Sequence, residues 1–339
     1  MRFPSHTEAF EALLLKAADA GRDAALFGGA ACRVRDAAPP FLIGERFPEV
    51  YLEFPLAGRP FLDVTLLYGE LEDDARIDSP LAEGCEDVLS FYARERARDA
   101  GIDFGFEIDC GGQAPSAAGV HFQPRSSSDL VAPFCEAAGS PGKAALYLAQ
   151  GERMPQGWPL SYFGMFRGRA DSPLRVCGYL SKEERRACAQ DPNRLARALG
   201  QAGFSAFDGT MLAQAARVIG LAPAEAEFQL DVLADGSLGD MFAIGVRFNR
   251  LPSAEVRRSF ASGVGASVMA QLREWGIADE REAHVAEMAF TRGVNVWRDD
   301  GSFVPFGFSL LPGWLKVQWR NGILQPAKMY MMASAGPVH

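Results

Sequence analysis

The sequence predicts an α+β fold, in which five helix-strand-strand repeats build a ten-stranded antiparallel β-barrel with helices outside and a solvent-filled lumen. Three observations lead to this prediction. Extended segments occur in pairs joined by turn residues, and the chain contains five such pairs. Each strand alternates apolar and polar residues, so every hairpin has one apolar and one polar face. Before each pair lies a segment whose apolar residues recur at helical spacing. No low-complexity linker divides the chain, so we expect one domain over residues 1–339.

The elements follow one another in a regular order. Residues 7–20 carry apolar side chains at helical spacing, as an amphipathic helix does. The first strand pair turns at Ala57-Gly58 and the fourth at Asp235-Gly236. Ser181 followed by Glu184 is typical of a capping box at a helix start. The predicted helical segments are 7–20, 83–99, 129–138, 181–219, 253–275 and 280–291, and the predicted strand pairs are 50–71, 104–123, 160–180, 227–248 and 313–332.

The last strand pair carries the clearest hairpin signal. Asn321-Gly322 separates two alternating runs, and Asn-Gly in this setting is the strongest short-range indication of a hairpin. Lys316 and Gln318 share one face of the first strand, and Lys328 and Tyr330 share one face of the return strand. The opposite faces are mostly apolar. One side of this hairpin therefore suits a helix layer, and the other suits water or a polar interior.

Two packings would satisfy five amphipathic hairpins. An open ten-stranded sheet could cover its apolar face with helices and leave its polar face in water. A ring closed by the first and last hairpins would instead remove both sheet edges. Ten strands make a ring wider than the eight whose interior side chains can fill, so a closed barrel would enclose a chamber. We favour the closed ring.

Composition argues against several classes of function. The formal net charge is -9 and no dense basic tract offsets it, which argues against nucleic acid as the main partner. No apolar run approaches the roughly 18–20 residues that a membrane span needs, and the N-terminal segment does not resemble a signal peptide, so we expect a cytoplasmic protein. The Cys and His residues lack metal-ligand spacing, and no glycine-rich phosphate loop is present.

The polar faces of the hairpins carry a charge pattern. Acids gather in the first two hairpins, with Glu53 and Glu107 as examples, and bases gather in the last three, with Arg167, Arg247 and Lys316 as examples. Such a segregation suits a substrate with an anionic end and a cationic or cation-forming end. Charge balance across a lumen would produce the same pattern without a substrate.

Five successive helix-strand-strand units that build a barrel are typical of the ABBA prenyltransferases, and the chain resembles this family, in particular the cyanobactin type that prenylates ribosomally made peptides. Tyr51-Leu52-Glu53 resembles the position of that branch's acidic catalytic residue. Phe106-Glu107-Ile108-Asp109, followed by Val120-His121-Phe122, resembles the second repeat with its His-bearing strand. Lys328-Met329-Tyr330 resembles the Lys-x-Tyr pairs that hold a diphosphate. Asp63 stands where the family would be expected to have a diphosphate-binding Arg.

Prenyl transfer requires three kinds of protein group. Fixed cations hold the departing diphosphate, aromatic faces shield the allyl cation from water, and a carboxylate takes the proton that the acceptor loses. Glu53 is the predicted catalytic base. The predicted diphosphate-binding residues are His121, Arg175, Tyr179, Arg247, Lys316, Lys328 and Tyr330; the predicted acceptor-binding residues are Asp63, Glu107, Asp109 and Asp231; and the aromatic residues suited to shield the cation are Tyr51, Phe163, Tyr179 and Trp314.

The acceptor is the open part of this hypothesis. We expect a nucleophilic side chain of a peptide, with Arg, Trp and Tyr as candidates, and a dimethylallyl or geranyl diphosphate donor. Magnesium is a possible companion of the donor, no protein metal ligand is predicted, and a monomer is expected. The alternatives are prenylation of a small aromatic molecule, a non-enzymatic barrel that binds a hydrophobic anion, and a structural α+β protein without an enclosed chamber.

Overall fold

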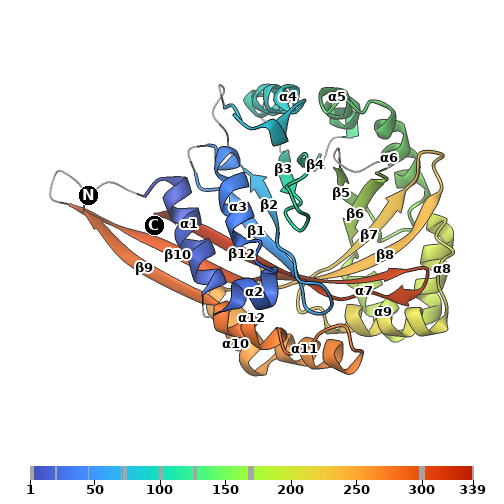
Figure 1. Cartoon of the computed structure of the whole chain (residues 1–339). Coiled ribbons are helices and arrows are strands. Elements are labelled where there is room, and N and C mark those ends of the chain that lie inside the picture. The colour runs from blue at the N-terminus through green and yellow to red at the C-terminus, as the bar shows by residue number, and fades with distance from the viewer. Residues whose placement is uncertain are drawn as a thin grey trace.

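Ten strands pair side by side in one antiparallel ring (Figure 1). The computed structural model describes residues 4–19, 21–44, 46–69, 71, 75–98, 102–124, 128–166, 172–297 and 302–337. The ring strands are β1 (Glu49–Pro55), β2 (Asp63–Tyr68), β3 (Asp103–Ile108), β4 (Gly119–Gln123), β5 (Leu160–Met165), β6 (Leu174–Tyr179), β7 (Ala226–Val232), β8 (Leu238–Arg247), β10 (Phe303–Arg320) and β12 (Lys328–Pro337).

The last hairpin closes the ring from both sides. Strand β12 pairs with β1, where Glu53 lies opposite Tyr330. Strand β10 pairs with β12 on one side and with β8 on the other, where Trp314 lies opposite Arg247. Each ring strand therefore has two neighbours, and the predicted closed barrel is confirmed.

The Asn-Gly turn forms as the sequence predicts. Asn321 and Gly322 have φ values of 50° and 74°, and both central residues of a type I′ hairpin turn require positive φ. Beyond the turn, the short strand β11 (Ile323–Leu324) pairs with the end of β10. The chain then returns as β12, whose first residue, Lys328, lies opposite Lys316.

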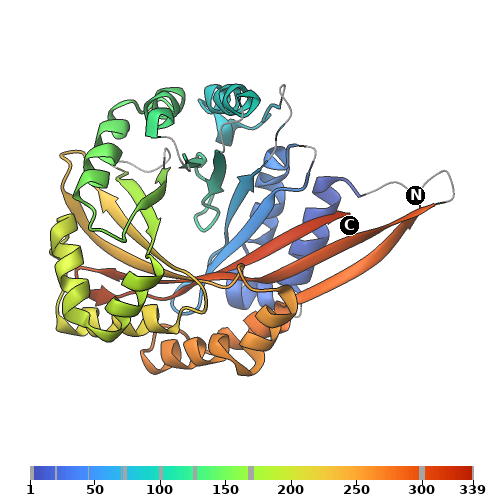
Figure 2. The same ribbon diagram turned by 180° about the vertical axis from the view of Figure 1, so that it is seen from behind.

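Helices cover the outer face of the barrel (Figures 1 and 2). The apolar side chains of the strands point toward them, as in the stacking of Phe122 on β4 against Phe134 on α5, with ring centroids 4.0 Å apart. The helices and 3₁₀ turns are α1 (His6–Ala18), α2 (Arg22–Phe27), α3 (Ala31–Ala37), η1 (Pro39–Phe41), η2 (Pro80–Ala82), α4 (Glu86–Ala97), η3 (Ser128–Leu130), α5 (Val131–Ala137), α6 (Gly142–Arg153), α7 (Lys182–Gln190), α8 (Pro192–Ala202), α9 (Gly209–Leu221), α10 (Ser253–Ser262), α11 (Val264–Glu274) and α12 (Glu282–Met288). No helix in the described ranges is long and apolar enough to cross a membrane.

The segment before the last hairpin differs from the prediction. The helix expected over residues 280–291 ends at Met288, and a strand follows, β9 (Phe290–Trp297). This strand pairs with the first half of β10, which begins at Phe303, ten residues before the predicted start. Thr, Val and Trp favour strands, and a short apolar run is ambiguous between helix and strand. Strands β9, β10 and β12 extend beyond the ring as an arm (Figure 2).

Candidate active site

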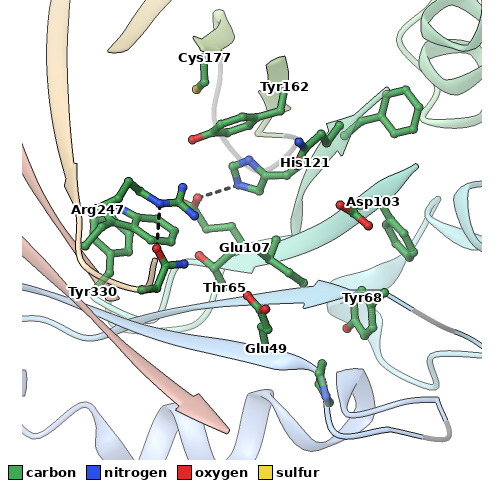
Figure 3. Close-up of a pocket in the computed structure, with 18 of the residues that line it drawn as sticks. Glu49, Thr65, Tyr68, Asp103, Glu107, His121, Tyr162, Cys177, Arg247 and Tyr330 are labelled. Carbon is green, nitrogen blue, oxygen red and sulfur yellow. Dashed lines mark hydrogen bonds and ion pairs between the residues drawn. The ribbon is translucent and has the colours of Figure 1, made fainter. Parts of the chain in front are cut away.

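The barrel encloses a chamber of about 740 Å³. Because side chains alternate along each strand, the polar residues of the hairpins point inward and line it (Figure 3). Glu49, at the start of β1, lies at the mouth, together with Asp103 and Arg250 from other strands and loops. Pro55, at the end of β1, lines a separate cavity of about 210 Å³ instead. The barrel therefore has an open chamber at one end and a smaller pocket at the other.

Three cations line the chamber from strands β6, β8 and β10. Arg247 donates hydrogen bonds from Nη1 to Glu227 Oε2 at 2.9 Å and to the Tyr179 hydroxyl at 3.0 Å. Arg175 pairs with Asp231, with 3.2 Å between Nε and Oδ1. Both guanidinium groups are thus fixed in position, and each has a buried carboxylate that balances its charge.

The third cation, Lys316, is held differently. Its side chain is buried, with 6% of the residue exposed, and Nζ lies 5.1 Å from the centre of the Tyr330 ring. Within the described residues no hydrogen bond or ion pair holds this ammonium group. Burial lowers the pKa of Lys316, and the nearby cations Arg175 and Lys328 lower it further, whereas Glu53 acts in the opposite direction. Lys316 therefore faces the chamber without a hydrogen-bonding or ion-pairing partner among the residues that the structure describes.

A stacked aromatic cluster forms the wall beside these cations. Trp314 stacks on Tyr330 with centroids 4.3 Å apart and lies 4.5 Å from the Tyr51 ring. The Arg247 guanidinium sits 4.8 Å from the centre of the Trp314 ring. Asn249 ties the cluster together, because it accepts a hydrogen bond from Arg247 Nε and donates one to the Tyr51 hydroxyl. Trp314 and Tyr330 face the chamber, and Tyr51 packs behind them.

One of the predicted shielding residues points the other way. Phe163 packs against Phe134 and Tyr147 on the helix side, so its predicted place in the chamber is wrong. A register irregularity between Leu160 and Tyr162 shifts the alternation in β5. Tyr162 takes the inward position instead and lies 6.4 Å from Tyr179, measured between ring centroids.

The wall formed by β3 and β4 carries an acid and an imidazole. Glu107 and His121 both line the chamber, and 2.9 Å separates Glu107 Oε2 from His121 Nε2 (Figure 3). Gly164 on β5 lies beneath the imidazole, and a Cβ at this position would approach Nδ1 and Cε1 to 2.9 Å. The imidazole can rest on the strand only because residue 164 has no side chain.

The predicted base, Glu53, does not reach the chamber. Its side chain is buried, and Oε1 lies 2.5 Å from Lys328 Nζ. Burial opposes ionisation of Glu53, but the ammonium groups of Lys328 and Lys316 hold its pKa below the usual value. Lys328, which was predicted to bind the diphosphate, lines the smaller cavity at the opposite end with Arg59 and lies 5.0 Å from the Phe61 ring. Glu53 and Lys328 therefore form an ion pair between the neighbouring strands β1 and β12.

Of the four acids predicted to bind an acceptor, only Glu107 lines the chamber. Asp63 Oδ1 accepts hydrogen bonds from the backbone N–H groups of Cys110 and Gly111, at 2.7 and 3.0 Å, so this side chain braces the turn after β3. Burial raises the pKa of Asp63 to about 8, and Glu53 contributes to the shift. Asp231 is paired with Arg175, and Asp109 lies beyond the end of β3 near Asp63.

Most of the residues that were predicted to bind the diphosphate line the same chamber. His121, Arg175, Tyr179, Arg247, Lys316 and Tyr330 line one chamber, and Lys328 alone lies outside it. Arg167, also assigned to the inner face, lies outside the described residues. Sequence reasoning missed Glu227, which is fully buried against Arg247 and shares a strand face with Gln229 and Asp231. The same alternation that identified Asp231 would have identified Glu227.

Comparison with solved structures identifies proteins that share this fold. 5-Dimethylallyltryptophan synthase from Streptomyces coelicolor superposes with a TM-score of 0.51 at 15% identity, over 97% of both chains. AnaPT from Neosartorya fischeri superposes with a TM-score of 0.54 at 8% identity, over 99% of this chain and 96% of its own. The prenyltransferase PriB gives 0.51 at 14% identity, over 98% and 96%. The chain has the ABBA prenyltransferase fold.

Comparison with known sequences finds no such relation. No family model matches the sequence, and no curated protein matches it. The described residues contain no group of three or more His, Cys, Asp or Glu side chains placed to hold a metal ion. The groups in the chamber that could contact an anion are Lys and Arg side chains and phenol hydroxyls.

Proposed function

We propose that this chain is an enzyme that transfers a prenyl group from an allylic diphosphate to an aromatic acceptor. The observation that carries the proposal is the chamber: it is enclosed by a closed barrel, and Arg175, Arg247 and Lys316 line it together with the phenols of Tyr179 and Tyr330. A leaving diphosphate needs such fixed charge-assisted donors in a site from which water is excluded. PriB, a barrel of the same fold with a TM-score of 0.50 and 14% identity, has been solved with its product diphosphate.

Lys316 is the cation best suited to meet the diphosphate directly. Arg247 and Arg175 already have Glu227 and Asp231 as partners, so a diphosphate would have to share or displace these carboxylates. Lys316 has no such partner among the described residues, and a diphosphate beside it would replace the hydration that burial removes. We infer that the diphosphate lies against strands β6, β8 and β10, with Lys316 at its centre.

The chamber's size and lining suit the rest of the reaction. A volume of about 740 Å³ falls within the usual range of roughly 300–1,000 Å³ for ligand sites, which leaves room for a dimethylallyl or geranyl donor and an aromatic ring together. Tyr162, Tyr179 and Trp314 supply aromatic surface near the cations. Such surfaces stabilise an allyl cation and keep water from capturing it.

The acceptor we favour is the indole or phenol of a Trp or Tyr residue in a peptide. Several carboxylates would be needed to hold an Arg guanidinium, but of the four acids predicted to bind the acceptor only Glu107 lines the chamber. An aromatic acceptor needs only one nearby carboxylate, so it agrees better with this arrangement. The mouth, with Arg46, Glu49, Asp103 and Arg250 around it, presents both charges to a peptide backbone and its side chains.

The experiment is mass spectrometry after incubation with dimethylallyl or geranyl diphosphate and magnesium. Free Trp, Tyr and Arg should be compared with the same residues inside peptides. We expect a mass gain of one prenyl unit on Trp or Tyr, and greater turnover on peptides than on the free amino acids. Binding of the donor without release of diphosphate would instead identify a non-enzymatic binding protein.

A further inference from the structure

The imidazole of His121 lines the chamber, and its two nitrogens differ in their surroundings. Nε2 lies 2.9 Å from Glu107 Oε2. A carboxylate accepts hydrogen bonds and donates none, so this contact places the proton of the neutral ring on Nε2. The lone pair is then on Nδ1, which makes no hydrogen bond to any residue that the structure describes. His121 therefore presents a nitrogen that can accept a proton.

Gly164 keeps this nitrogen uncovered. It lies directly opposite His121 on the neighbouring strand β5. A Cβ at position 164 would come within 2.9 Å of both Nδ1 and Cε1 of the imidazole. Any side chain there would cover this edge of the ring or push the ring away, so glycine preserves the access of a ligand to Nδ1.

The place of His121 in the barrel suits a contact with the acceptor. Strand β4, which carries it, and strand β10, which carries Lys316, are five steps apart in the ten-stranded ring, so they lie on opposite walls. The diphosphate is proposed to lie against Lys316. An acceptor between the two walls has the donor on one side and His121 on the other, beside the ring of Tyr162 (Figure 3).

We propose that His121 is the catalytic residue that takes the acceptor's proton at Nδ1, and that Glu107 is a positioning residue that fixes the tautomer of the imidazole. The inference rests on the proposed prenyl transfer and assigns its proton acceptor. A general base must come within about 2.6–3.2 Å of the atom that loses the proton, and histidine is the side chain most often used. Once the proton has moved, the carboxylate of Glu107 stabilises the imidazolium.

The step balances as follows. The C1–O bond of the donor breaks, and its electron pair leaves with the diphosphate. The nucleophilic atom of the acceptor forms a new bond to C1. The proton on that atom passes to Nδ1 of His121, and the resulting imidazolium later returns it to water at the open mouth.

The first test needs no substrate. NMR chemical shifts of the histidine ring nitrogens distinguish the Nε2–H ring, the Nδ1–H ring and the imidazolium, and His121→Gln identifies the signals of this residue. We expect the Nε2–H form in the wild type at pH 8. Glu107→Gln should lose this preference, because a carboxamide can donate as well as accept. A wild-type Nδ1–H ring or imidazolium would overturn the assignment of the base, and an unchanged Nε2–H form in Glu107→Gln would overturn the positioning role.

The second test measures release of inorganic diphosphate and formation of prenylated acceptor in the same reaction. In His121→Ala we expect the ratio of product to diphosphate to fall about 100-fold, because general bases contribute at least about this factor and water captures the unused cation as prenol. Added imidazole should restore much of the ratio, since it replaces the missing base in the space that the side chain leaves. A purely structural role would not respond to imidazole.

His284→Ala is the matched control. His284 also faces a carboxylate, with 3.0 Å between Nδ1 and Glu287 Oε2, but it lies on α12 and does not line the chamber, so the ratio should stay at the wild-type value. Circular dichroism establishes that each variant is folded.

The inference is overturned if folded His121→Ala retains the wild-type ratio, or if imidazole leaves its lowered ratio unchanged. Should His121→Ala fail to fold, His121→Gln keeps a hydrogen-bonding group beside Glu107, and a wild-type ratio in that variant would likewise overturn the inference. Absence of any diphosphate release from the wild type would refute the proposed function instead.

Discussion

Replacing Lys316 with Met should make the protein more stable and less able to bind a prenyl diphosphate. The wild-type ammonium group is buried, and among the described residues no hydrogen bond or ion pair replaces the water that folding removes from it. An unsatisfied buried polar group costs about 1–3 kcal/mol, and Met fills a similar volume without a charge. We therefore expect a gain of about 1–2 kcal/mol in the free energy of unfolding at pH 7.

The same change should weaken donor binding. A hydrogen bond to a charged group contributes about 1.5–3 kcal/mol, and 1.4 kcal/mol is tenfold in affinity, so the Kd for dimethylallyl diphosphate should rise roughly 10- to 150-fold. Urea unfolding and isothermal titration calorimetry measure the two effects. Lys182→Met, at an exposed lysine, is the control and should change neither quantity beyond about 0.5 kcal/mol.

The sign of the pH dependence follows from the direction of the pKa shift. Burial lowers the pKa of Lys316 in the folded state, so at alkaline pH the unfolded chain binds more protons at this site than the folded chain. The advantage of Lys316→Met should therefore shrink as the pH approaches 10.5, the unshifted value. A Lys316→Met protein that is less stable than the wild type at pH 7 and binds the donor equally well would refute this reasoning.

Two further predictions concern Glu53 and Asp63, two buried acids that do not line the chamber. Glu53→Gln removes the carboxylate that pairs with Lys328, whose side chain is 30% exposed. It should cost about 1.5–3 kcal/mol of unfolding free energy in urea, the contribution of a hydrogen bond to a charged group, and the double variant Glu53→Gln/Lys328→Met should recover most of the loss. Equal stability of the single and double variants would contradict the pairing. Asp63 has a folded pKa of about 8, above its unfolded value, so the folded state binds the extra proton and stability should fall as the pH rises from about 4 to about 8. Asp63→Asn keeps the oxygen that accepts the two backbone hydrogen bonds and should remove this slope in thermal unfolding between pH 5 and 8; an unchanged slope would exclude Asp63 as its source.

The fold was predictable because alternation determines which face of each strand is buried. The positive φ of Asn321 and Gly322 and the pairing of β1 with β12 follow from features visible in the sequence. The inward positions of Arg175, Arg247 and Lys316 follow from the same alternation. Strand β9 was not predicted: its first two residues were assigned to the helix over 280–291, because a short apolar run does not distinguish a strand from the end of a helix.

The pairing of charges inside the barrel could not be predicted in the same way. Alternation gives the face of a residue but not its depth along the barrel axis, which depends on the register between strands distant in sequence. Glu53 and Lys328 are 275 positions apart, and they meet only because β12 pairs with β1. Glu53 and Glu107 were both predicted to point inward. Only Glu107 lines the chamber, whereas Glu53 is buried in its ion pair with Lys328.

The most direct test of the central claim is to incubate the protein with dimethylallyl diphosphate and a Trp-containing peptide, and to measure prenylated peptide and released diphosphate together. Lys316→Met serves as the internal comparison. We predict equal amounts of the two products from the wild type, and a greatly reduced rate from Lys316→Met when the donor is scarce. A wild-type protein that binds the donor but leaves the diphosphate intact, with every Trp and Tyr acceptor unmodified, would contradict the assignment of this barrel as a prenyltransferase.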